Sequence, residues 1–320
     1  MKLIRGTHNI PPLSGERVLT IGNFDGVHLG HQQVIEQLLA QSQRLNLVST
    51  VMLFEPQPME FFAGVKAPAR ISSFRDKYQQ LAALGIDELL VMRFGPQFAQ
   101  MSATEFVKAL LVDKLQVRHL VIGDDFRFGA QRRGNFELLQ QAGQDYGFGV
   151  QNTHSYCLQG ERVSSTLIRR GLANNQFEEV ARWLGRRYQI QGHVVHGQKL
   201  GRQLGFPTAN LHMPGGHSSL KGVYAMSVTS VDGQPVNWPA VANIGHRPTA
   251  NGRDLLLEVH VLDRKETLYG RRLVVEPRMK LRDEVKFDSL DALQRQVHAD
   301  MQRARIWFEN QDNSTGTVDR

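Results

Sequence analysis

The 320-residue sequence is poor in cysteine, since Cys157 is the only one. A single cysteine excludes an intramolecular disulfide and a zinc cluster built from several thiolates of one chain. Such usage fits a reducing compartment, so we expect the protein in the cytoplasm. The chain also lacks a long uncharged apolar run, and its first residues lack the apolar stretch of a secretory signal. We therefore expect no membrane contact.

Positive charge is only mildly in excess of negative charge: 38 Lys and Arg stand against 31 Asp and Glu, which gives a formal net charge of +7. No basic run dominates, and the arginine pairs are scattered. The balance alone suits either a nucleic-acid binder or an enzyme for anionic substrates, and the scattered arginines favour a nucleotide or phosphate partner. We expect no nucleic-acid partner. At 41% hydrophobic residues, a chain of this length is expected to fold into two globular domains.

The first half alternates short apolar runs with helical patterns. The expected strands are Val18 to Ile21, Val48 to Phe54, Leu89 to Phe94, His119 to Ile122 and Phe148 to Thr153. Strands that alternate with helices predict a doubly wound, Rossmann-like parallel sheet. Ligands of such sheets bind beyond the carboxyl ends of the strands, so the loops after Ile21, Phe54 and Ile122 are candidate binding loops.

The second half is mostly β. Asp232-Gly233 between two apolar runs is a strong hairpin signal, because both residues tolerate the positive φ angles of tight turns. A helical pattern follows Ser289 and closes the fold. We place a domain boundary at Gly185, which gives domains 1–185 and 186–310, and we expect a flexible tail at 311–320.

A first chemical pattern runs from Thr20 to His31. Its glycines permit a tight backbone turn, and His28 and His31 lie three residues apart at the expected start of a helix, beside unpaired backbone N–H groups. The arrangement suits polyphosphate binding. Two histidines at this spacing also occur by chance or as metal ligands, so the spacing alone leaves those interpretations open.

With Gly-Asn-Phe-Asp-Gly before the histidines, this stretch resembles the HxGH-type motif of bacterial bifunctional riboflavin kinase/FMN adenylyltransferases. A second segment, Arg162-Val-Ser-Ser-Thr-Leu-Ile-Arg169, resembles that family's second phosphate motif. The resemblance implies His28 and His31 as catalytic residues. The implied ATP-binding residues are Gly22, Asn23, Phe24, Asp25, His28, His31, Ser164, Ser165, Thr166 and Arg169. The Ser164-Ser165-Thr166 run also fits a plain helix N-cap, and both roles are compatible.

The resemblance further implies Asp125 and Arg162 as FMN-binding residues. In the implied reaction, the phosphate of FMN attacks the α-phosphorus of ATP, and pyrophosphate leaves while Arg169 clamps it. One departure is Gln57, which stands where that family often has histidine. The role of this position is therefore open.

A third segment, Gly201 to Asn210, resembles the signature of the riboflavin kinase module, which implies a β-barrel with a closing helix. No GxxxxGK[ST] sequence occurs, so a kinase here is not a P-loop enzyme. The implied ATP-binding residues are Gly201, Phe206, Pro207, Thr208 and Asn210, with Mg²⁺ on Thr208 and Asn210.

By the same resemblance, Glu258 is the general base for the riboflavin 5′-hydroxyl, and Arg282 and Glu284 line the flavin side. From its own pattern, Glu258 is equally an ordinary outward-facing residue that alternates with Leu257 and Val259.

Two other functions fit the sequence less well. HxGH-like motifs also occur in aminoacyl-tRNA synthetases, but a KMSKS-like partner is missing, which disfavours an RNA-binding or tRNA-charging protein. A chain with only one of the two activities is disfavoured by intact motifs in both halves. The expected partners are ATP, riboflavin, FMN and FAD. The sequence leaves the oligomeric state open, and we expect a monomer.

Overall fold

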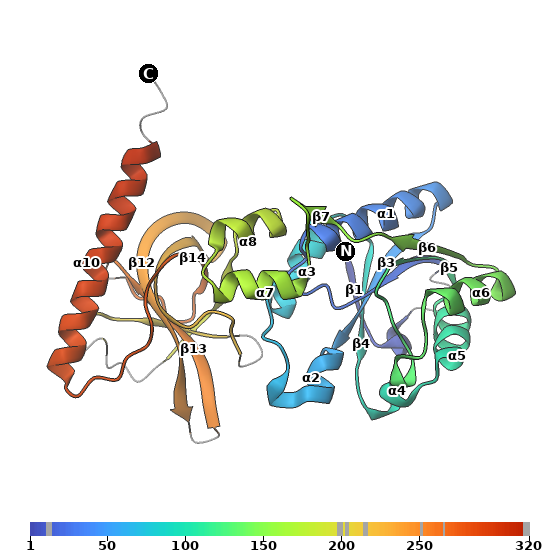
Figure 1. Cartoon of the computed structure of the whole chain (residues 1–320), viewed down its shortest axis with the longest axis horizontal. Helices are drawn as coiled ribbons and strands as arrows, with labels where there is room; N and C mark the ends of the chain where they lie inside the picture. Colours follow the sequence, from blue (N-terminus) through green and yellow to red (C-terminus); the bar gives the residue numbers. More distant parts are fainter. Residues whose placement is uncertain are drawn as a thin grey trace. The chain divides into compact units, whose positions relative to one another are not determined.

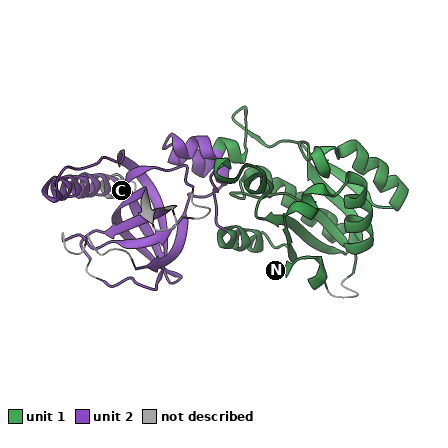
Figure 2. Cartoon of the chain, turned by 90° about the horizontal axis from the view of Figure 1, so that it is seen from below, with its two compact units in different colours: residues 1–68, 74–167 green, residues 69–73, 168–320 purple. Residues whose placement is uncertain are grey.

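The computed structural model describes residues 1–10, 15–196, 201, 205–213, 217–249, 252–264 and 266–315. The chain forms two compact units (Figure 2). The first comprises Met1–Pro68 and Phe74–Leu167, and the second comprises Ala69–Ser73 and Ile168–Arg320. No helix within the described ranges is both long enough and apolar enough to cross a membrane.

The first unit contains a six-stranded parallel sheet in the order β1-β4-β3-β2-β5-β6, which confirms the predicted architecture (Figure 1). Its strands are β1 (Lys2–Arg5), β2 (Arg17–Ile21), β3 (Val48–Glu55), β4 (Glu88–Arg93), β5 (Val117–Gly123) and β6 (Gly149–Thr153). The strands β7 (Cys157–Leu158) and β8 (Glu161–Arg162) form a separate small hairpin.

Helices cover both faces of this sheet, and each face has its own apolar core. The helices are α1 (Leu29–Leu45), α2 (Pro58–Ala63), α3 (Phe74–Ala83), α4 (Pro96–Gln100), α5 (Ala103–Glu105) and α6 (Phe136–Tyr146). Single turns η1 (Thr7–Asn9), η2 (Gly64–Lys66) and η4 (Ala130–Arg132) and a π-helix η3 (Phe106–Lys114) complete the unit.

Helix α5 has a capping box at its first turn. Ser102 Oγ accepts a hydrogen bond from the Glu105 amide at 3.1 Å, and the Ser102 amide donates to Glu105 Oε2 at 2.9 Å. These hydrogen bonds hold the pKa of Glu105 below its usual value. The box therefore starts the helical segment that continues into η3.

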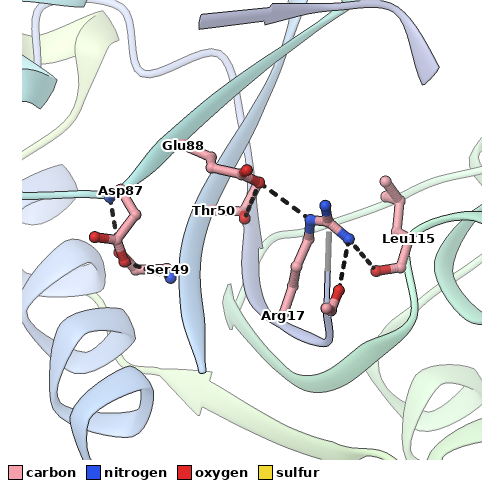
Figure 3. A network of polar contacts seen from close by, with 7 residues as sticks. Arg17, Ser49, Thr50, Asp87, Glu88 and Leu115 are labelled. Carbon is pink, nitrogen blue, oxygen red and sulfur yellow. Dashed lines mark hydrogen bonds and ion pairs between the residues drawn. The ribbon is translucent and has the colours of Figure 1, made fainter. Parts of the chain in front are cut away.

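A buried ion pair joins the amino ends of the parallel strands (Figure 3). Arg17, only 1% exposed, directs Nε to Glu88 Oε2 at 3.2 Å and donates through its guanidinium to the carbonyls of Gly15 and Leu115. Thr50 Oγ1 lies 3.4 Å from the same Glu88 oxygen. Structural contacts therefore occupy the closed end of the sheet, where the amino ends of the strands lie. The loops expected to bind ligands follow the carboxyl ends of the strands, at the opposite edge.

The second unit contains a closed antiparallel barrel in the strand order β10-β13-β12-β11-β14-β9, in agreement with the barrel that the resemblance implied. Its strands are β9 (Ile190–Val195), β10 (Ala209–His212), β11 (Gly222–Val231), β12 (Gln234–Thr249), β13 (Gly252–Val261) and β14 (Arg272–Arg282). Asp232 and Gly233, with φ angles of 51° and 84°, form the predicted turn between β11 and β12.

Within the described residues, the helices that accompany the barrel are α7 (Ser165–Ala173), α8 (Phe177–Leu184) and α10 (Leu290–Thr315). Helix α10 packs on β11, β12 and β14, where Ala304 is fully buried. The flexible tail expected from 311 is wrong for residues 311–315, which continue this helix. The backbone hydrogen bonds of a helix need no apolar side chains, so a polar sequence can continue a helix without the apolar period that would have revealed it.

The units divide at Leu167, although the sequence suggested a boundary at 185. The segment between these positions packs with the barrel: Tyr224 donates its hydroxyl hydrogen to Asn175 Oδ1 at 3.2 Å, and its ring lies 6.2 Å from that of Phe177. Burial raises the pKa of Tyr224 to about 12, so this hydroxyl stays protonated. The division into functional domains at 185 stays a prediction.

Two candidate active sites

A cavity of about 1040 Å³ lies at the carboxyl ends of strands in the first unit. The loops after β2, β3 and β5 all contribute to its lining, as the sheet topology predicts. Of the predicted ATP-binding residues, those that line it are Gly22, Asn23, Phe24, His28, His31, Ser164, Ser165 and Thr166.

His28 is the N-cap of α1, and its Nδ1 accepts the His31 amide at 3.3 Å. Accepting this hydrogen bond requires an unprotonated Nδ1, so the neutral ring carries its proton on Nε2. The His28 and His31 rings stack with their centroids 3.6 Å apart. The helix start therefore presents two imidazoles together with its own positive dipole end to the cavity.

The two predicted phosphate motifs contact each other directly. Ser165 Oγ donates to the Asp25 carbonyl at 2.9 Å, and a Cβ on Gly30 would lie 3.3 Å from the Val163 carbonyl. A side chain at position 30 would make this contact tight, so glycine favours the close approach of the two segments. Ser164 Oγ accepts the Leu167 amide at 3.2 Å, so the N-cap interpretation of this serine is also right.

Two predicted ATP-binding residues do not line the cavity. Asp25 is 2% exposed and is absent from the lining; its backbone carbonyl joins the two motifs. Arg169 belongs to the second unit, where its Nε donates to the Ala69 carbonyl at 2.6 Å. Their roles toward ATP stay predictions.

The predicted FMN-binding residues Asp125 and Arg162 meet at the rim. Arg162 donates to Asp125 Oδ2 at 2.9 Å and lies 3.4 Å from Asp124 Oδ1. Ser155 Oγ donates to Asp124 Oδ2 at 2.8 Å, which fixes the carboxylates from the other side. All four side chains line the cavity.

A wall of phenylalanines lines the rest of the cavity and was missed by sequence reasoning. Its members are Phe54, Phe62, Phe94, Phe98, Phe106, Phe126 and Phe128. Neighbouring ring centroids are 5.0 to 6.1 Å apart. Phe62, on α2, is 67% exposed, which is unusual for so large an apolar side chain. The available signal was the recurrence of phenylalanine after successive strands.

Gln57 lies at the N-cap of α2 and is buried. Its backbone amide donates to Glu60 Oε2 at 2.9 Å, and its side chain is not part of the cavity lining. In this chain the position thus helps start the short helix that carries Phe62.

The second cavity, of about 240 Å³, lies between the barrel and α10. Of the residues predicted for the kinase, those that line it are Gly201, Phe206, Thr208, Asn210, Glu258, Arg282 and Glu284. Pro207 lines a small neighbouring pocket that shares Thr208. Residues 202–204 of the signature lie outside the described residues.

Glu258 stands between two amides. In the barrel register it is opposite Asn210 on β10 and opposite Asn243 on β12, so the three side chains share one face. Leu257 and Val259 are buried on the other face, which confirms the expected alternation. The outward face at Glu258 is nevertheless not open to bulk solvent, because residues of α10 line the same cavity. Asn243 was missed by sequence reasoning.

A buried acid fixes Arg282. Asp300 on α10 is 1% exposed and accepts Arg282 Nε at 2.9 and 3.2 Å, and Gln296 donates to the same carboxylate at 3.0 Å. The Arg282 guanidinium lies 5.6 Å from the ring centre of Phe287, which also lines the cavity. The described ranges hold no cluster of three or more His, Cys, Asp or Glu that could bind a metal.

Comparison with known proteins decides the family. Residues 11–167 match the FAD synthetase family, and residues 184–308 match the riboflavin kinase family. The bifunctional riboflavin kinase/FMN adenylyltransferase of Escherichia coli K12 is 48% identical over 309 residues, which cover 96% of this chain and 98% of the relative. The chain belongs to the bifunctional riboflavin kinase/FMN adenylyltransferase family. It phosphorylates riboflavin to FMN and adenylylates FMN to FAD.

Further relatives agree over the full length. The Haemophilus influenzae member of this bifunctional family is 46% identical over 310 residues, covering 97% of this chain and all of the relative. A crystal structure described as a macrolide-efflux protein from Streptococcus pneumoniae superposes with a TM-score of 0.75 at 27% identity, covering 95% of this chain and 99% of that one. That description belongs to the other protein. No finding supports the RNA-binding alternative.

Proposed function

We propose that each reaction uses the residues of one cavity: FMN adenylylation in the first unit and riboflavin phosphorylation in the barrel. The observation that carries this assignment is that each cavity holds a different chemistry. Stacked imidazoles at a helix start suit a polyphosphate, and a carboxylate between two amides suits the activation of a hydroxyl group.

In the first cavity, we assign the ATP phosphates to the start of α1 and to Ser164, Ser165 and Thr166. The FMN phosphate oxygen forms a bond to the α-phosphorus of ATP while the bond to the pyrophosphate oxygen breaks. His28, which carries its proton on Nε2, donates a hydrogen bond to the oxygens on which charge accumulates, and His31 acts beside it. No covalent enzyme intermediate is needed.

The phenylalanine wall supports the flavin assignment of the same cavity. A flat aromatic ligand gains most from stacking on exposed aromatic rings, and Phe62 is 67% exposed at this surface. Asp125 and Arg162, paired at the rim, supply the polar contacts to FMN in this proposal. An arginine held by carboxylates is already oriented before the ligand arrives.

In the barrel cavity, Glu258 accepts the proton of the riboflavin 5′-hydroxyl as its oxygen attacks the γ-phosphorus of ATP and ADP leaves. Gly201, Phe206 and Pro207 are assigned to ATP, and Arg282 and Glu284 to the flavin. Asn210 and Asn243 flank Glu258 in the strand register, so the base stands in a row of polar side chains on one face of the barrel wall.

The same cavity fits a magnesium ion that accompanies ATP. Asn210 is 4% exposed, and its Oδ1 has no hydrogen-bond partner among the described residues. With the Thr208 hydroxyl, which lines the cavity beside it, this oxygen offers the hard ligands that Mg²⁺ prefers. The ion would neutralise phosphate charge when bound. Location in the cytoplasm and a monomeric state, without a nucleic-acid partner, remain expectations.

The assignment is tested by two variants in one assay: chromatography of riboflavin or FMN incubated with protein and Mg·ATP. His28→Asn retains a side-chain acceptor for the helix N-cap but removes the imidazole. We expect it to slow FAD formation by about 100-fold or more and to leave FMN formation intact. Glu258→Gln should have the opposite effect, abolishing FMN formation while FAD still forms from supplied FMN.

The activity of the other cavity shows that the other unit is intact, and circular dichroism and thermal melting against the parent chain show that the altered unit is folded. If a folded variant lost both activities, or if FMN formation survived Glu258→Gln, the assignment of residues to reactions would be wrong.

A further inference from the structure

Strand β12 has a gap at Gly245, called the slot below, on the face that lines the barrel cavity. The Glu284 side chain, from the segment after β14, fills this slot. Asn243 and Gly245 are two residues apart on this strand, and the register with β13 is regular, so both lie on the face that lines the cavity. Gly245 is buried and its φ is not positive. A tight turn therefore does not explain the glycine.

The Glu284 carboxylate occupies the space that a side chain at 245 would take. An ideal Cβ on Gly245 would overlap Glu284 Oε1 and lie only 2.6 Å from Glu284 Cδ. Asn243 Nδ2 donates to the same Oε1 at 3.2 Å. Glu284 itself is exposed, and among the described residues Asn243 is the one that donates a hydrogen bond to its carboxylate.

We propose that Gly245 and Asn243 are positioning residues for the riboflavin kinase reaction: together they hold the Glu284 carboxylate over strand β12. This inference rests on the proposed assignment of Glu284 to the flavin side. Riboflavin carries hydroxyl groups on its ribityl chain and a ring N–H, and a carboxylate fixed in one place accepts hydrogen bonds from such donors. A carboxylate free to swing into solvent would lose part of that interaction to side-chain entropy.

The geometry predicts a specific defect for Gly245→Ala. The added methyl group meets the far end of an exposed, flexible side chain, so the barrel can accept it while Glu284 swings away. We expect the KM for riboflavin to rise about tenfold, the cost of one charge-assisted hydrogen bond, with kcat changed less than about twofold. The KM for ATP and FMN adenylylation by the same chain should be unchanged.

A double-mutant cycle separates positioning from a general structural effect. If Gly245 acts through Glu284, then adding Gly245→Ala to Glu284→Ala changes the riboflavin KM by less than about twofold. Gly192→Ala is the matched control, because Gly192 is also a barrel-strand glycine, but its Cβ would face only the Leu211 side chain. Asn243→Ala is a second variant that adds no atoms, and it should raise the riboflavin KM in the same direction.

Three outcomes overturn the inference. The first is an unchanged riboflavin KM in Gly245→Ala and Asn243→Ala. The second is an effect of Gly245→Ala that persists in full without Glu284. The third is an unchanged riboflavin KM in Glu284→Ala while Glu258→Gln abolishes FMN formation; the kinase assignment then stands and the positioning role fails. FMN formation that survives Glu258→Gln is instead a failure of the assignment itself.

Discussion

Single residues decide this protein's chemistry through backbone contacts as much as through their own side chains. His28 caps α1 by accepting the His31 amide at Nδ1. The same hydrogen bond places the proton of the neutral ring on Nε2. Ser164 likewise caps a helix start and lines the cavity. At both positions the capping role is compatible with the proposed phosphate-binding role, because an N-cap is by geometry the place where a helix start meets an anion.

The residue-scale prediction concerns the buried ion pair at the closed end of the sheet. Glu88→Gln removes a carboxylate partner of Arg17, whose side chain is 2% exposed, and so weakens the neutralisation of a buried charge. We expect unfolding free energy to fall by about 3 kcal/mol in denaturant titrations. The control is Glu16→Gln, which removes an exposed pair with Arg118 and should cost much less, because solvent screens this pair. Equal losses would show that burial does not control the effect.

Whole elements were predicted well where their signals are local. The strands of the sheet core follow from short apolar runs and turn residues. Strand β1 was missed because four residues, Lys2–Arg5, with charges at both ends show no convincing period. Strands β9 and β10 were also missed, since a short strand in a barrel is defined by its neighbours rather than by its own composition.

The element-scale prediction concerns the tether between α10 and β14. Asp300→Asn keeps the shape of the side chain but removes the charge that orients Arg282. We expect the thermal midpoint of unfolding to fall by about 5 °C and the riboflavin KM to rise about tenfold. Asp291→Asn, in the exposed first turn of the same helix, is the control and should change neither quantity appreciably. A riboflavin KM that stays constant in Asp300→Asn would separate Arg282 from flavin binding.

At the scale of the molecule, the two described cavities are each lined by residues of one unit only. FMN made in one can therefore be used by another copy of the chain. We predict that His28→Asn and Glu258→Gln proteins, each unable to make FAD from riboflavin, restore FAD formation when they are mixed. The time course should show FMN first and FAD after a lag that shortens at higher protein concentration. No FAD from the mixture would mean that FMN does not pass between copies.

The sequence by itself determined the two halves, the parallel sheet, the hairpin at Asp232-Gly233 and the candidate residues His28, His31 and Glu258, because each depends on spacing within a short stretch. Only the tertiary structure decided the phenylalanine wall, the row of Asn210, Glu258 and Asn243, and the slot at Gly245. These join segments far apart in the chain, and strand register and close packing, which no local pattern encodes, set which side chains meet.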